Sequence, residues 1–177
     1  MTTIETGTND LLAENINGVG VITLNRPDAR NAMSGKMNAA LSHTLAAWEL
    51  DPAIKCIILT GAGKGFCAGG DVKGMAASGD GTVGDNTIDG AIHAQRVMQR
   101  ATAGKLFKMP KPTIAALPGA AAGAGLSFAL ACEFNKGLLN AVGVGDIGAE
   151  GLGGQPPGDE QRVQPFAHAA GNIGANA

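Results

Sequence analysis

The sequence KCIILTGAGKGFCAGGD, residues 55–71, joins a short apolar run to a turn made almost wholly of small residues. The apolar run Lys55–Thr60 ends at a glycine and predicts a buried β-strand. The same order recurs downstream, where Pro112–Leu117 predicts a strand and the small-residue turn PGAAAGAGLS, residues 118–127, leads into a helix predicted over Gly125–Phe134. Because small residues let another molecule approach the backbone closely, we expect both turns, Gly65–Asp71 and Gly119–Gly125, to present N–H groups to a ligand oxygen.

The neighbouring segments extend this pattern into an α/β segment that ends near residue 134. Val19–Leu24 is a β-branched run closed by Pro27, which predicts a strand. From Ser34, a suitable N-cap, apolar residues recur at helical spacing as far as Trp48 and predict an amphipathic helix. A further helix is predicted over Asp89–Phe107. Its inward face is expected to hold Ile92, Val97, Met98 and Ala101.

The pattern changes after Phe134. Residues 135–177 show no sustained period of 3.6 or 2 and are rich in Gly, Ala, Pro and Gln. Such a segment buries too little side chain to offset the entropy of ordering its glycines. We therefore divide the chain into a core, residues 1–134, and an atypical tail, residues 135–177, that is expected to be disordered or translated out of frame.

Composition excludes several classes of protein. The chain of 177 residues has a formal net charge of −2 and no run of basic residues, which disfavours a nucleic-acid partner. It has no apolar leader segment and no uninterrupted apolar stretch of about 18 residues, so we expect neither export nor a membrane partner. Its 3 cysteines lack metal-ligand spacing, which predicts free thiols in the cytoplasm and no metal site.

Two common phosphate-binding motifs do not fit the glycine turns. A P-loop would need Gly in place of Ile58 and Ser or Thr after Lys64, and a dinucleotide fingerprint would need a small residue in place of Phe66 or Phe128. An oxyanion site remains, in which one N–H from each turn points at the same carbonyl oxygen. The alternative is that both turns are close helix–strand contacts without a ligand.

Three ordered motifs, NRPDARNAMS (25–34), GFCAGGDVKGM (65–75) and KPTIAALPGAAAGAGLSFALACEF (111–134), resemble the enoyl-CoA hydratase/isomerase (crotonase) family over residues 18–134. The resemblance implies an α/β fold, a crotonase-like spiral of ββα repeats that is truncated in this chain. It also implies an acyl-CoA thioester as substrate, in fatty-acid or related acyl-CoA metabolism, through an enolate held by an oxyanion hole. No cofactor is implied, since coenzyme A enters as part of the substrate. Relatives form homotrimers or hexamers through a C-terminal region that has no counterpart here.

The resemblance assigns site residues by position. It places the oxyanion-hole N–H groups at Ala68 and Ala124. It places Asp28, Ala29 and Arg30 along the CoA moiety, and Ala68, Gly69, Gly70, Asp71 and Val72 along the acyl and pantetheine path.

The sequence departs from the family pattern where hydratases carry two glutamates. Ser127 replaces the first, and a serine hydroxyl has no useful basicity at neutral pH without a partner base. Asp146 and Glu150 lie near the distance of the second but lack its surrounding pattern, so surface charge is the favoured interpretation. Glu133 is interpreted as a polar contact at a helix end, and Cys67 as a small buried thiol because nothing places a histidine beside it. Two functions therefore stay open: enolate chemistry on an acyl-CoA, or a truncated, non-catalytic protein that binds acyl-CoA or joins an oligomer.

Overall fold

The computed structural model describes residues 1–72 and 88–136, except for the side chains of Ala91 and Lys136. Its elements are β1 (Thr2–Ile4), β2 (Leu11–Ile16), β3 (Val19–Leu24), the 3-10 helix η1 (Pro27–Ala29), α1 (Gly35–Leu50), β4 (Cys56–Gly61), α3 (Ile88–Ala101), α4 (Ala103–Phe107), β5 (Thr113–Ala116), α5 (Ala124–Ala131) and β6 (Phe134–Lys136). All described residues fall in one compact unit, Met1–Val144. Nearly all of the predicted tail lies outside them, so the proposed division of the chain stays a prediction.

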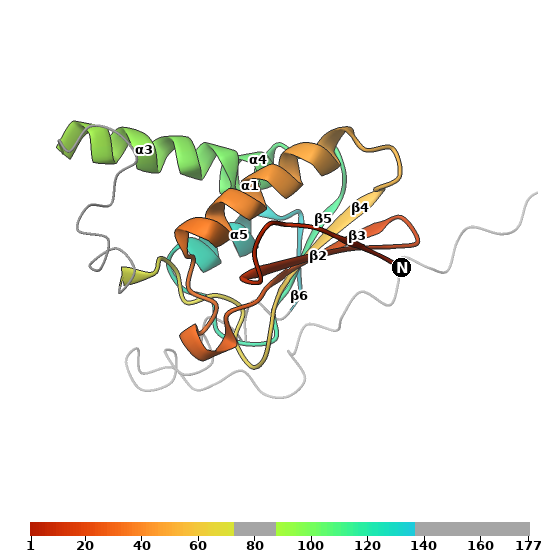
Figure 1. Ribbon diagram of the computed structural model, residues 1–177, viewed down its shortest axis with the longest axis horizontal. Coiled ribbons are helices and arrows are strands. Elements are labelled where there is room, and N and C mark those ends of the chain that lie inside the picture. The colour runs from red at the N-terminus through yellow and green to blue at the C-terminus, as the bar shows by residue number, and fades with distance from the viewer. Residues whose placement is uncertain (73–87, 137–177) are drawn as a thin grey trace, which may run out of the picture. The chain divides into compact units, whose positions relative to one another are not determined.

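The described strands form one mixed sheet in the order β1-β2-β3-β4-β5-β6. The pairs β1–β2 and β2–β3 are antiparallel, and the pairs from β3 to β6 are parallel. In Figure 1, α1 lies across the sheet, with α4 and α3 beyond it. Because the carboxyl ends of β4 and β5 meet at one edge of the sheet, the turns that follow these strands lie side by side. None of the described helices is long and apolar enough to cross a bilayer.

The predicted strands over 19–24, 55–60 and 112–117 are confirmed as β3, β4 and β5 to within a residue or two at their ends. The helix that begins after Ser34 is confirmed as α1, and the Ser34 side chain accepts a hydrogen bond from the N–H of Met37. The ammonium of Lys111 donates to the carbonyls of Trp48 and Asp51, which satisfies acceptors at the end of α1. The core of the fold therefore follows the periodicity of the sequence.

The N-terminal hairpin was not predicted, because its sequence reads as polar and acidic. In β2, Leu11 and Ala13 are fully buried while Leu12 is exposed, so a two-residue alternation is present. Asn17 and Gly18 both have positive φ, 54° and 91°, as a two-residue hairpin turn requires. This Asn-Gly pair, between two apolar runs, is the signal that could have predicted the hairpin.

The helix predicted over Asp89–Phe107 is broken. Thr102 separates α3 from α4, and its hydroxyl donates to the carbonyl of Met98 at 2.8 Å. The expected inward face is also wrong in part, because Ile92 is 43% and Val97 48% exposed, although Met98 and Ala101 are half-buried. A helical period shows which residues share a face but not whether another element covers that face.

The last predicted helix also ends early. α5 stops at Ala131, and Phe134 begins β6, where it is 62% exposed. The apolar composition of this stretch was therefore no guide to the end of the helix.

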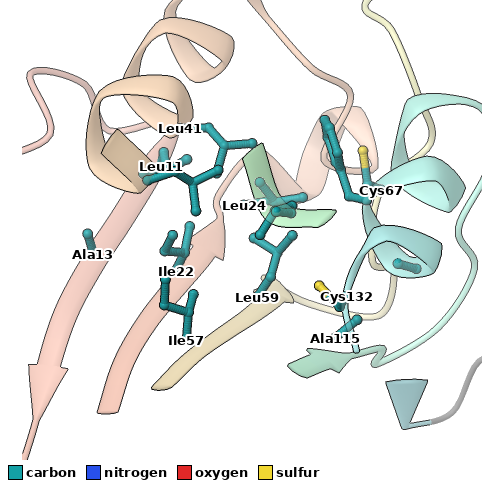
Figure 2. Packing of buried hydrophobic residues seen from close by; sticks show 14 of the residues in the cluster. Leu11, Ala13, Ile22, Leu24, Leu41, Ile57, Leu59, Cys67, Ala115 and Cys132 are labelled. Atoms are coloured by element: carbon teal, nitrogen blue, oxygen red, sulfur yellow. The ribbon is translucent and has the colours of Figure 1, made fainter. Parts of the chain in front are cut away.

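The hydrophobic core lies between the sheet and α1, and it continues to α5. Figure 2 shows Leu11 of β2 beside Leu41 of α1, and Cys132 beside Ala115 near α5. Cys67 is also fully buried in this core, and all three cysteines are free thiols. The first turn is thus anchored in the core by one of its own side chains.

Candidate functional site

The two predicted turns are joined by main-chain hydrogen bonds. The N–H groups of Phe66 and Cys67 donate to the carbonyl of Ala120 at 3.0 and 3.3 Å, and the N–H of Ala122 donates to the carbonyl of Cys67 at 2.9 Å. Cys67 and Ala121 form an isolated parallel bridge. The two turns therefore form one backbone surface at the end of the parallel strands.

Several small residues are required by this close approach. A Cβ on Gly119 would lie 2.0 Å from the carbonyl oxygen of Lys64, and one on Gly125 would lie 2.3 Å from that of Cys67. Gly69 has φ +103° and would place a Cβ 3.1 Å from the carbonyl oxygen of Ala122. The close-contact interpretation thus accounts for these glycines, and any site for a ligand depends on which N–H groups remain unpaired.

The N–H groups of Gly70 and Ala124 are among those at this junction that have no hydrogen-bond partner within the described residues. Ala124 is the first residue of α5, so its N–H lies at the positive end of the helix dipole. The Cβ position of Gly69 is 3.6 Å from the nitrogen of Ala124, which shows how closely the Gly70 segment approaches that end. The arrangement suits one oxygen atom that carries negative charge.

Ala68 was predicted to provide the donor from the first turn. In the structure its N–H donates to the carbonyl of Arg30 at 3.0 Å, so it can reach a ligand only by sharing or exchanging that bond. By contrast, the residues on both sides of Gly70 bond to Met33: the N–H of Met33 donates to Gly69, and the N–H of Asp71 donates to Met33. In this parallel bridge between Met33 and Gly70, the N–H of Gly70 points away from Met33.

Asp71 was predicted to line the path of the substrate. Its carboxylate accepts a hydrogen bond from Nη1 of Arg26 at 2.8 Å, in an ion pair whose side chains are 17% and 24% exposed. The same Nη1 donates to the carbonyl of Ala32 at 2.7 Å, and Nε of Arg26 lies 3.7 Å from Oδ2 of Asp10. Arg26 therefore connects the first turn to two other segments, and its role was missed in the sequence.

Asn31 was also missed. It is fully buried with φ 55°, and its side-chain amide donates to the carbonyls of Ala62 at 2.9 Å and Gly65 at 2.8 Å. Its Oδ1 accepts from the N–H of Arg26 at 2.9 Å. The signal that could have predicted this role is an Asn in the turn that follows the NRP motif. Asn tolerates the left-handed conformation, and its side chain bonds nearby backbone groups.

The residues predicted along the CoA moiety lie on and just after η1. Asp28 and Arg30 are exposed and Ala29 is half-buried. The structure brings this segment beside the first turn through the bond between Arg30 and Ala68. Val72, at the end of that turn, is exposed.

Among the described side chains considered for catalysis, none is hydrogen-bonded to another. Burial raises the pKa of the Cys67 thiol, which opposes formation of a thiolate. Ser127 is exposed, and its hydroxyl donates to the carbonyl of Gly123 at 3.3 Å. Glu133, His43 and His93 are exposed. Asp146, Glu150 and His168 lie outside the described residues. Within 1–72 and 88–136, no three His, Cys, Asp or Glu residues are grouped as a metal site would require.

The chain matches a model of the enoyl-CoA hydratase/isomerase family over residues 14–136. It is 40% identical over 113 residues to 1,2-epoxyphenylacetyl-CoA isomerase of Escherichia coli K12. The matched region covers 64% of this chain and 41% of the relative. It is also 36% identical over 140 residues to (E)-benzylidenesuccinyl-CoA hydratase of Thauera aromatica. That matched region covers 78% of this chain and 51% of the relative.

The structure is similar to that of an enoyl-CoA hydratase/isomerase from Marinobacter aquaeolei, with a TM-score of 0.63, 35% identity, and coverage of 72% of this chain and 48% of the other. The crotonase-like α/β fold is thereby confirmed. The chain spans about half the length of the relatives it matches.

Proposed function

The chain belongs to the enoyl-CoA hydratase/isomerase family, and from this premise we propose that it binds an acyl-CoA thioester and stabilises its enolate where the two turns meet. The observation that supports this function is that the N–H groups of Gly70 and Ala124 have no hydrogen-bond partner in the part of the chain that the structure describes. In this proposal the thioester oxygen accepts a hydrogen bond from each. In this proposal Gly70 replaces Ala68, the donor that the resemblance implies, because the N–H of Ala68 donates to the carbonyl of Arg30.

Two N–H donors suit enolate chemistry because negative charge develops on the thioester oxygen when hydroxide from the solvent takes a proton from the adjacent carbon and forms water. Donors fixed in advance bind the charged oxygen better than the neutral one, and loss of one donor costs about 3–4 kcal/mol of transition-state stabilisation. The positive end of α5 adds to this effect. No metal or redox group is needed for this step, and coenzyme A enters as part of the substrate.

Ser127 bears on the type of reaction. A hydratase with two glutamates uses one of them to activate water, and a serine that donates to the carbonyl of Gly123 does not supply that basicity. We therefore propose isomerisation or other enolate chemistry, within fatty-acid or related acyl-CoA metabolism, rather than hydration by a pair of glutamates. We place the protein in the cytoplasm, where its three cysteines stay reduced.

The proposal is tested by exchange of the α-hydrogens of butanoyl-CoA with deuterium in D2O, followed by mass spectrometry. Ala124→Pro removes the N–H at the first helical position, where proline is tolerated, and Ala124→Ser keeps that N–H as the matched control. We expect exchange in the wild type and in Ala124→Ser, and a rate about 100- to 1000-fold lower in Ala124→Pro. Equal rates in all three proteins would contradict the oxyanion site. Binding of butanoyl-CoA without exchange above the buffer rate would instead support the non-catalytic alternative.

A further inference from the structure

The peptide unit that carries the N–H of Gly70 also contains the carbonyl of Gly69, and Met33 is bonded both to this unit and to the next one. The carbonyl of Gly69 accepts from the N–H of Met33 at 2.8 Å, and the N–H of Asp71 donates to the carbonyl of Met33 at 3.3 Å. The second of these hydrogen bonds is long, so the main chain alone holds Asp71 less firmly than Gly69. The side chain of Asp71 provides the additional restraint.

That restraint comes from Arg26. Its Nη1 donates both to Asp71 at 2.8 Å and to the carbonyl of Ala32 at 2.7 Å, so one guanidinium nitrogen joins the first turn to the residue just before Met33. The Nε side faces Asp10 at 3.7 Å, and Asp10 in turn accepts a hydrogen bond from the hydroxyl of Ser34 at 2.5 Å. A planar guanidinium with several partners is far more restrictive than a single exposed ion pair.

We propose that Arg26 is a positioning residue for the oxyanion site: it holds Asp71 and the strand of Met33 together, and thereby fixes the direction of the Gly70 N–H toward the thioester oxygen. Asp71 is then an anchor of the turn rather than a contact of the substrate. This inference rests on the proposed function, since it concerns the same carbonyl oxygen. A purely structural ion pair would change stability but not the recognition of a carbonyl.

The test compares two ligands that differ only at the carbonyl. The first is but-2-enoyl-CoA, and the second is its thioether analogue, in which a methylene replaces the carbonyl. Their ratio of Kd values, measured by isothermal titration calorimetry, reports the hydrogen bonds to the thioester oxygen. The variant is Arg26→Gln. The matched control is Lys105→Gln, which removes an ion pair of similar length and exposure, Lys105–Glu49 at 2.7 Å, between α4 and α1.

We expect the wild type and Lys105→Gln to bind the thioester more tightly than the thioether. In Arg26→Gln this preference should be about 2- to 10-fold smaller, with little change in the Kd for the thioether. The infrared band of a ¹³C-labelled thioester carbonyl should shift to lower frequency when it binds the wild type, and should shift less in Arg26→Gln. An Arg26→Gln variant that keeps both the full preference and the full shift overturns the positioning role. A wild type without any preference for the thioester overturns the proposed function itself, so the two failures are distinguishable.

A conservative variant covers the case in which Arg26→Gln does not fold. Arg26→Lys keeps the charge but cannot reproduce the planar geometry of the guanidinium. With thermal unfolding as the check on folding, an intermediate loss of thioester preference in Arg26→Lys supports the proposal. An unchanged preference in this folded variant counts against it.

Discussion

Gly125 lies where α5 passes closest to the first turn. A Cβ there would be 2.3 Å from the carbonyl oxygen of Cys67 and 2.6 Å from its Cβ, and neither atom can move without disturbing the core. We expect Gly125→Ala to lower the free energy of unfolding by about 1–3 kcal/mol, measured by urea denaturation. Gly35→Ala is the matched control, because nothing lies within 4 Å of its Cβ position at the start of α1. If both variants unfold at the same urea concentration, the close approach of the turns does not require glycine.

Cys132 makes the stability of the fold sensitive to alkali. Burial raises its pKa from 9.0 to about 11, although a hydrogen bond with Thr113 acts in the opposite direction. The unfolded chain therefore loses this thiol proton first, so its contribution to stability is complete below pH 9 and is lost as the pH rises to 11. This difference in pKa between the folded and the unfolded chain corresponds to about 2–3 kcal/mol in the free energy of unfolding.

The measurement is the free energy of unfolding between pH 8 and pH 11 for the wild type and Cys132→Ala. We expect the wild type to lose more stability over this range than the variant, so that the two curves converge. Parallel curves would show that the thiol of Cys132 does not ionise differently in the folded and unfolded chains.

At the same scale, the sequence predicted that the first turn supplies a donor, but it could not distinguish between the N–H groups of Ala68 and Gly70. Ala68 and Gly70 are two positions apart in one motif, and both have an N–H. What separates them is the partner of each group, Arg30 for Ala68 and none within the described residues for Gly70. That difference depends on the positive φ of Gly69 and on a bridge to Met33, which no local pattern reveals.

At the scale of elements, α1 depends on its first residue. The hydroxyl of Ser34 accepts from the N–H of Met37 at 3.1 Å and donates to Asp10 at 2.5 Å, so Ser34→Ala leaves both partners without this hydroxyl. We expect a loss of about 1–2 kcal/mol in the free energy of unfolding. Ser127→Ala is the control, since that hydroxyl is exposed and its change should stay within about 0.5 kcal/mol. Equal effects of the two substitutions, measured by urea denaturation, would mean that the cap of α1 adds nothing to stability.

Elements with a continuous periodic signal were predicted well, and those defined by distant contacts were not. The helix after Ser34 and the strand Val19–Leu24 contain their own signal, namely a cap, a period and a terminating residue. β6 has only three residues, Phe134–Lys136, and is a strand because β5 lies beside it. The break at Thr102 likewise depends on packing, because the sequence on both sides continues to favour a helix.

For the molecule as a whole, the order of strands predicts an order of stability. β3 and β4 each have a neighbouring strand on both sides, whereas β1 pairs only with β2 among the described residues. Every residue of β1 is exposed, but Ile57 and Leu59 of β4 are fully buried. Amides in β4 should therefore exchange with solvent only when the whole core unfolds, while those of β1 exchange through local opening.

Native-state hydrogen exchange in low concentrations of urea tests this order. We expect exchange in β4 to accelerate steeply with urea, because global unfolding exposes much surface, and exchange in β1 to depend little on urea. Gly125→Ala provides an internal check: it should speed exchange in β4 in proportion to its loss of global stability and leave β1 almost unchanged. If β1 and β4 respond equally to urea and to this substitution, the N-terminal hairpin is part of the same cooperative unit as the parallel strands. The segment from Asp10 to Ser34, which contains Arg26, would then be as rigid as the core. In that case Ser34 would support the first turn through its hydrogen bond to Asp10, in addition to capping α1.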